Sequence, residues 1–67
     1  MGAGDTIRMI REKEGLSQRE LGNISGISAQ SVCNYEHGRN DPTTAVFRQL
    51  LDAMGYELVV RKKKETQ

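Results

Sequence analysis

Two short segments with the apolar spacing of helices lie on either side of Gly26, and no other feature constrains the fold as strongly. The first spans residues 16–25 and the second spans residues 29–37. So few residues separate them that the chain must turn sharply, which glycine permits because it tolerates positive φ angles. The apolar residues expected to point inward around this turn are Leu21, Ile24, Ile27 and Val32.

Two further helices are predicted, one before and one after this pair. Ile7 and Ile10 share a face of the segment at residues 6–14, and apolar residues recur every three or four positions across residues 44–54. The four helices together predict an all-α fold. The expected capping residues are Asp5 or Thr6, Ser17 in a capping box with Glu20, Ser28 and Thr43.

The pattern changes after Gly55, where Tyr56, Leu58 and Val60 alternate with other residues and predict one β-strand over residues 56–61. A lone strand leaves its backbone groups without partners, so we expect it to pair with the same strand of a second copy. The alternative is a disordered basic tail after the last helix. The expected division is an N-terminal arm (1–5), a helical domain (6–55), a dimerisation strand (56–61) and a basic tail (62–67).

Length and composition exclude several classes of function. A chain of 67 residues has little room for a core and a deep substrate cleft, and no catalytic constellation is present, so we expect no enzyme. One cysteine and one histidine are too few for a disulfide or a metal site, and we expect no cofactor. No apolar run approaches the ~20 residues of a membrane helix, and no secretory leader is seen, which favours a cytoplasmic protein without membrane contact.

The charge is unevenly distributed along the chain. Residues 1–60 carry six Lys/Arg and eight Asp/Glu, a balance of −2, whereas residues 61–67 carry four Lys/Arg and one Glu, a balance of +3. A basic tail of this kind is usually only a solvated segment. Charge alone therefore gives a mild indication of an anionic partner.

The exposed face of the segment at residues 29–37 is better suited to nucleic acid. The second helix of such a pair can lie in the major groove of DNA. Gln30 and Asn34 carry amides, which can bond N6 and N7 of adenine together, and Ala29 can contact a thymine methyl group. The remaining members of this face are Ser31, Cys33 and His37.

Residues 7–56 resemble the helix-turn-helix domain of the Cro/cI repressor type, the XRE family. The resemblance implies a lambda-repressor-like bundle of four short helices that binds a double-stranded DNA operator, usually as a homodimeric transcriptional repressor. The segments that carry it are Ile7-Arg8-Met9-Ile10-Arg11, Gly15-Leu16-Ser17-Gln18-Arg19-Glu20-Leu21, Gly26-Ile27-Ser28, Val32-Cys33-Asn34-Tyr35-Glu36-His37-Gly38-Arg39 and Pro42-Thr43.

The same resemblance implies roles for individual residues. Arg11 and Glu36 match an internal salt bridge, and Gln18 matches a residue that fixes a phosphate and supports the DNA-reading helix. Bases are expected to meet residues 29, 30 and 34, and phosphates to meet Ser28 and Arg39. The full set of expected DNA-binding residues is Gln18, Arg19, Ser28, Ala29, Gln30, Ser31, Asn34 and Arg39.

Two departures from the family pattern leave alternatives open. Gly22 stands where the family usually has alanine, and a glycine inside a helix predicts that the helix is locally less stable. A strand at residues 56–61 replaces the usual fifth helix, and this ending resembles the HipB-type antitoxins. The chain is therefore expected to be a repressor, with two alternatives: an antitoxin that also binds a toxin protein and regulates its own operon, or a protein-interaction module that does not bind DNA.

Overall fold

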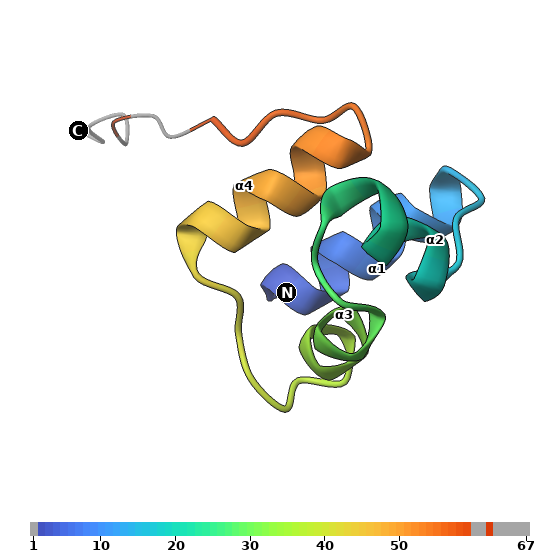
Figure 1. Ribbon diagram of the computed structural model, residues 1–67. Helices are drawn as coiled ribbons and strands as arrows, with labels where there is room; N and C mark the ends of the chain where they lie inside the picture. Colours follow the sequence, from blue (N-terminus) through green and yellow to red (C-terminus); the bar gives the residue numbers. More distant parts are fainter. Residues whose placement is uncertain (1, 60–61, 63–67) are drawn as a thin grey trace.

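The computed structural model describes residues 2–59 and Lys62, and this part of the chain contains four α-helices. In Figure 1, α1 lies in the middle of the view, with α4 above it, α2 beside it and α3 below it. This arrangement confirms the all-α fold expected from the apolar spacing. The elements are α1 (Ala3–Lys13), α2 (Gln18–Ser25), α3 (Ala29–Glu36) and α4 (Thr44–Ala53).

Local signals fix the starts of the last three helices where the sequence predicts them. Ser17 and Glu20 form the expected capping box: the Glu20 N–H donates to Ser17 Oγ at 2.9 Å, and the Ser17 N–H donates to Glu20 Oε1 at 2.8 Å. Ser28 and Thr43 cap α3 and α4 in the same manner, by accepting from backbone N–H groups three residues ahead. Gly26 ends α2 with a φ of +79°, which makes the sharp turn before α3 possible.

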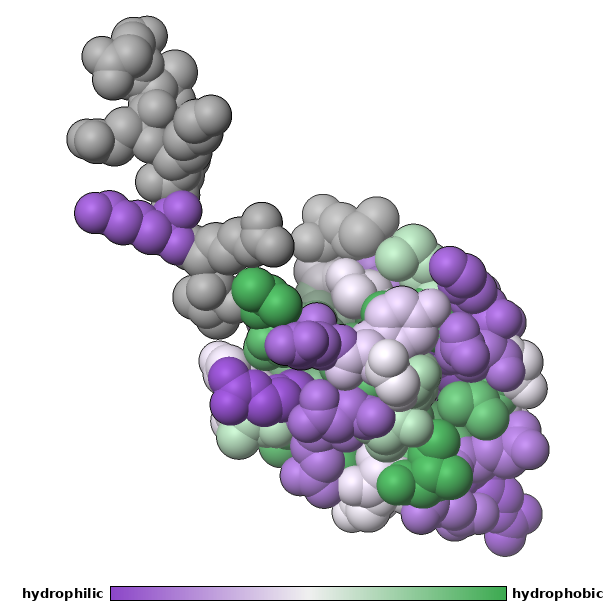
Figure 2. Space-filling view, turned by 90° about the horizontal axis from the view of Figure 1, so that it is seen from above, coloured by the Kyte–Doolittle hydropathy of each residue, from purple (hydrophilic) through white to green (hydrophobic). Residues whose placement is uncertain are grey.

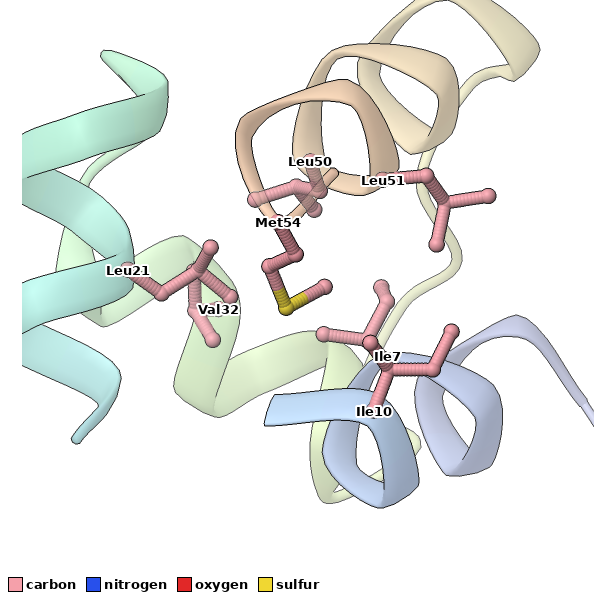
Figure 3. Packing of buried hydrophobic residues seen from close by; sticks show 7 residues of the cluster. All are labelled: Ile7, Ile10, Leu21, Val32, Leu50, Leu51 and Met54. Atoms are coloured by element: carbon pink, nitrogen blue, oxygen red, sulfur yellow. The ribbon is translucent and has the colours of Figure 1, made fainter. Parts of the chain in front are cut away.

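The core lies where all four helices meet. In Figure 3 side chains from α1, α2 and α3 point toward Leu50 of α4 and Met54, the residue that follows this helix. The buried hydrophobic residues are Ile7, Ile10, Leu21, Val32, Leu50, Leu51 and Met54, and Ile27 and Phe47 pack against them. Ile24 was expected in this set but is 53% exposed. Ser25, four residues after Leu21, takes the inward position on α2 instead.

The first helix begins earlier than its sequence predicts. It starts at Ala3 and not near residue 6, so much of the expected N-terminal arm is helical. Asp5 is not the capping residue: it lies inside the first turn, where its carboxylate accepts a hydrogen bond from the Gly2 N–H at 3.2 Å. Gly4 is buried against the Tyr35 carbonyl at the end of α3. The absence of a side chain at Gly4 therefore lets α1 approach the backbone of α3.

Gly22 has a comparable role in α2. A Cβ atom at this position would lie 2.9 Å from the Ile27 carbonyl oxygen and 3.1 Å from the Ala29 nitrogen. Both are backbone atoms, which cannot rotate away as a side chain can. The glycine that departs from the family pattern thus allows close contact between α2 and the turn that leads into α3.

The chain turns back over α4 after Gly55 (Figure 1). The Tyr56 N–H donates to the Leu51 carbonyl at 2.8 Å, and the Tyr56 hydroxyl donates to Glu14 Oε2 of α1 at 3.1 Å. Tyr56 and Leu58 also pack against the core of their own chain. Residues 60 and 61 of the expected strand, and all of the basic tail except Lys62, lie outside the described residues, so the strand stays a prediction.

We predict that Gly4→Ala lowers the free energy of unfolding by about 1–3 kcal/mol, because the new methyl group would overlap the Tyr35 carbonyl oxygen. Urea denaturation measures the change. The matched control is Gly2→Ala, whose Cβ would meet no atom within 4 Å and should have a much smaller effect. Equal stability of Gly4→Ala and the wild type would show that α1 is not held this close to α3.

Candidate nucleic-acid interface

The residues expected to contact DNA lie on the first turn of α2, on α3 with its cap, and in the loop after α3. The structure places these residues, and the ion pair that supports them, in three groups. One group surrounds a surface hollow at the turn, a second is a cluster of amides and a guanidinium on α3, and a third is an ion pair beneath the end of α3.

The hollow lies between α2 and the start of α3 and has a volume of about 490 Å³. Arg19, Ser28 and Ala29, all predicted site residues, line it together with Gly22 and Ile27. Ser28 is held by its neighbour, because its hydroxyl donates to Ser31 Oγ at 2.9 Å while accepting from the Ser31 N–H. The hollow therefore places the Arg19 side chain and the Ser28 hydroxyl beside the N-terminus of α3, a combination that suits a phosphate.

The amide cluster joins Gln30, Asn34 and Arg39. Gln30 Nε2 donates to Asn34 Oδ1 at 3.2 Å, and Arg39 Nη1 donates to the same oxygen at 3.2 Å. The spacing of four residues predicts that Gln30 and Asn34 share one face of α3. No local pattern predicts that Arg39, which lies beyond the end of the helix, reaches back to Asn34.

Cys33 and His37 complete the exposed side of α3. Arg39 Nη1 lies 3.9 Å from Cys33 Sγ, and His37 Nδ1 lies 2.9 Å from the Cys33 carbonyl oxygen. Cys33 borders the amide cluster through Arg39, and His37 is exposed. The exposed side of α3 thus carries uncharged polar groups with the Arg39 guanidinium beside them, and the first turn of α3 carries no acidic residue.

The ion pair between Arg11 and Glu36 joins α1 to the last residue of α3, as the family resemblance implies. Arg11 donates through Nε to Glu36 Oε2 at 2.7 Å and through Nη2 to Oε1 at 2.9 Å, and Nη1 donates to the Leu16 carbonyl at 2.8 Å. Gln18 Nε2 adds a hydrogen bond to Glu36 Oε1 at 3.1 Å. The Glu36 side chain is only 2% exposed and that of Arg11 is 12% exposed, so this pair is shielded from water.

The Glu36 carboxyl is ionised because its hydrogen-bond partners lower its pKa by more than burial raises it. Burial by itself raises the pKa of the Glu36 carboxyl, but hydrogen bonds from Arg11 and Gln18 and the charge of Arg11 bring this pKa below its usual value. The hydrogen bond to Glu36 likewise raises the pKa of Arg11. Because the Glu36 pKa is lowered on folding, its stabilisation is present above the pKa of an unfolded glutamate and is lost as the pH falls through the lowered value.

Sequence reasoning missed two supporting contacts. Gln49 of α4 donates through Nε2 to the Ser25 carbonyl at 2.6 Å, and Gly4 allows α1 to contact Tyr35. The first ties the end of α2 to α4, and the second places α1 against the end of α3. Each contact joins residues more than twenty positions apart, and no pattern in the sequence indicates either one.

Comparison with known proteins agrees with this geometry. Residues 7–60 match the family described as helix-turn-helix. The chain is 35% identical over 52 residues to an uncharacterized HTH-type transcriptional regulator of Sinorhizobium fredii, which covers 78% of this chain and 68% of that protein. It is 40% identical over 47 residues, 70% of this chain, to a Thermococcus kodakarensis protein whose name places it among HTH-type transcriptional regulatory proteins. The chain spans only 15% of the Thermococcus kodakarensis protein. No solved structure matches the chain significantly.

We predict that Arg11→Met or Glu36→Leu alone destabilises the fold by about 3–5 kcal/mol, since each leaves a buried charge without its partner. The double variant should lose less than the sum of the two single variants. Thermal melts at neutral pH measure all three.

The control is Arg8→Met, which removes the ion pair between Arg8 and Glu12. These side chains are both 58% exposed, and a solvated pair of this kind contributes only a few tenths of a kcal/mol. Losses from Arg11→Met no larger than those from Arg8→Met would contradict the assignment of a shielded structural pair.

Proposed function

The chain belongs to the XRE-type helix-turn-helix family of DNA-binding regulators, and from this premise we propose that it is a sequence-specific transcriptional repressor that presents α3 to the DNA major groove. The observation that carries the proposal is the fixed position of α3. Its last residue is held by the Arg11–Glu36 pair, while Gln30 and Asn34 stay accessible on its other side. A helix held at one angle can present the same side chains to every duplex it meets.

Contacts with bases and with phosphates fall to different residues in this proposal. Gln30 is exposed and can recognise a base edge in the major groove. Arg19 and Ser28 at the hollow, and Gln18 beside them at the start of α2, would meet phosphates. Gln18 suits this because its hydrogen bond to Glu36 uses one N–H and leaves the other to donate. Occupancy of an operator by such a protein would block transcription.

A homodimer fits this mode of binding. Two copies related by a two-fold axis would meet half-sites about 34 Å apart, one turn of the duplex. Figure 2 looks onto the side that carries α4 and the end of the described chain, where hydrophobic residues form separate areas among hydrophilic ones. Val59 is 54% exposed there, whereas Tyr56 and Leu58 pack on their own core. The pairing of two copies would therefore depend on the strand backbone and on Val59 more than on a broad apolar face.

We predict that Gln30→Ala weakens binding to the selected operator by about 1–3 kcal/mol and relaxes the preference at one base pair. Selection of bound sequences from a random duplex pool, for the variant and the wild type in parallel, is the measurement. Asp52→Ala, an exposed change on α4, is the control and should select the wild-type sequence. An unchanged selection by Gln30→Ala would refute its role in base recognition.

We predict that Val59→Pro converts the dimer to a monomer, because proline removes an N–H that the paired strands need. The variant keeps Tyr56 and Leu58, which the core requires, and every basic residue after position 60. Sedimentation equilibrium measures the mass, and Val59→Thr, which keeps the N–H, is the control and should stay dimeric. A dimer that survives Val59→Pro would place the interface on the helices.

A further inference from the structure

We propose that Arg39 determines base preference without touching a base: it orients the amide of Asn34 so that only N–H donors face the DNA. The inference rests on the proposed binding of α3 in the major groove. It assigns Arg39 a positioning role that a contact with phosphate alone would not give. It also assigns Asn34 a preference that differs from the adenine contact to which asparagine amides are otherwise suited.

Donor and acceptor chemistry fixes the orientation of both amides in the cluster. A guanidinium has N–H donors and no acceptor, so the Asn34 atom 3.2 Å from Arg39 Nη1 must be the oxygen. That oxygen cannot donate, so the Gln30 atom 3.2 Å away must be the nitrogen. Arg39 therefore sets the amide of Asn34 directly and the amide of Gln30 through it.

The backbone keeps Arg39 in reach of Asn34. The Arg39 N–H donates to the Asn34 carbonyl at 2.9 Å, and the Gly38 N–H donates to the Tyr35 carbonyl at 3.1 Å. These two bonds fold the loop back onto the last turn of α3. The guanidinium thus starts from a fixed point one turn along from the side chain that it orients, and it contacts Cys33 on the way.

The groups that remain available differ between the two amides. The Asn34 oxygen already accepts two hydrogen bonds, which fills both of its lone pairs, so the side chain offers only the two N–H donors of Nδ2. Gln30 keeps its oxygen and one N–H. Gln30 can therefore still bond N6 and N7 of adenine together, whereas Asn34 can do so only by breaking its bonds to Gln30 and Arg39.

A side chain that offers only donors matches a base edge that offers acceptors. In the major groove these are N7 and O6 of guanine and O4 of thymine, while adenine and cytosine each present an amino donor. The cluster therefore favours guanine or thymine at the Asn34 position. Without Arg39 the Asn34 oxygen would lose one of its two partners, the amide could rotate, and adenine would become acceptable there.

The experiment is selection of bound sites from a random duplex pool by four proteins: wild type, Asn34→Ala, Arg39→Ala and Arg19→Ala. Asn34→Ala identifies the base pair that Asn34 recognises, as the position where preference disappears. Arg19 is the matched control, since it is an exposed arginine at the hollow and has no contact with the amide cluster. Competition titrations on duplexes that differ only at that base pair then give the ratio of affinities for each protein.

We expect the wild type to prefer guanine or thymine at that position. In Arg39→Ala, the preference for guanine or thymine over adenine at that position should fall by about tenfold, which corresponds to the loss of one good base contact. Arg19→Ala should weaken all duplexes alike and keep the preference. Both arginine variants should lower the salt dependence of DNA affinity by about the contribution of one phosphate contact. Only the base preference therefore distinguishes an arginine that positions Asn34 from one that contributes its charge alone.

A second variant tests the same geometry in the opposite direction. Asn34→Asp keeps an oxygen for Gln30 and Arg39 but replaces the donors that face the groove with an acceptor. It should bind more weakly overall because of its charge, and its preference at that position should move to cytosine, whose N4 donates. A thermal melt of each variant should match the wild type, since these side chains lie outside the core.

Three results would overturn the inference: a wild-type preference for adenine at the Asn34 position, no position at which Asn34→Ala changes the selection, or a uniform loss of affinity in Arg39→Ala like that in Arg19→Ala. In each case the wild type would still select an operator, and the proposed function would stand. A wild type that selects no sequence at all would overturn both.

Discussion

The ion pair between Arg11 and Glu36 is the interaction on which the rest of this structure depends. It joins α1 to the last residue of α3, and Gln18 and the Leu16 carbonyl bring α2 into the same network. Burying two charges is unfavourable unless both are paired and hydrogen-bonded. Both conditions hold here, and among the described residues no buried side-chain nitrogen or oxygen is left without a partner.

Close backbone contacts bring the helices together in this short chain. Gly4 lets α1 approach Tyr35, and Gly22 lets α2 approach the turn at Ile27. A chain of this size can bury little apolar surface. Short distances between its helices let each buried apolar side chain contact more neighbouring atoms.

Among the described residues, no helix combines the length and apolar character needed to cross a membrane.

The two sides of α3 therefore serve different purposes. One side is fixed to the body through Glu36 and Val32, while the other carries the cluster of Gln30, Asn34 and Arg39. Hydrogen bonds within that cluster limit the rotamers of long polar side chains before any ligand arrives. A surface ordered in this way loses less conformational entropy on binding, which favours discrimination between similar duplexes.

The sequence by itself determined the four helices, the caps at Ser17, Ser28 and Thr43 and most of the core, because capping and apolar spacing are local signals. The family resemblance implied the pair of Arg11 and Glu36. The sequence misplaced Ile24, which is exposed, and the start of α1, which lies at Ala3. Only the tertiary structure decided that Gly4 meets Tyr35 and that Gln49 holds the end of α2. These contacts join residues more than twenty positions apart, which meet only after the chain has folded, so no short segment of sequence specifies them.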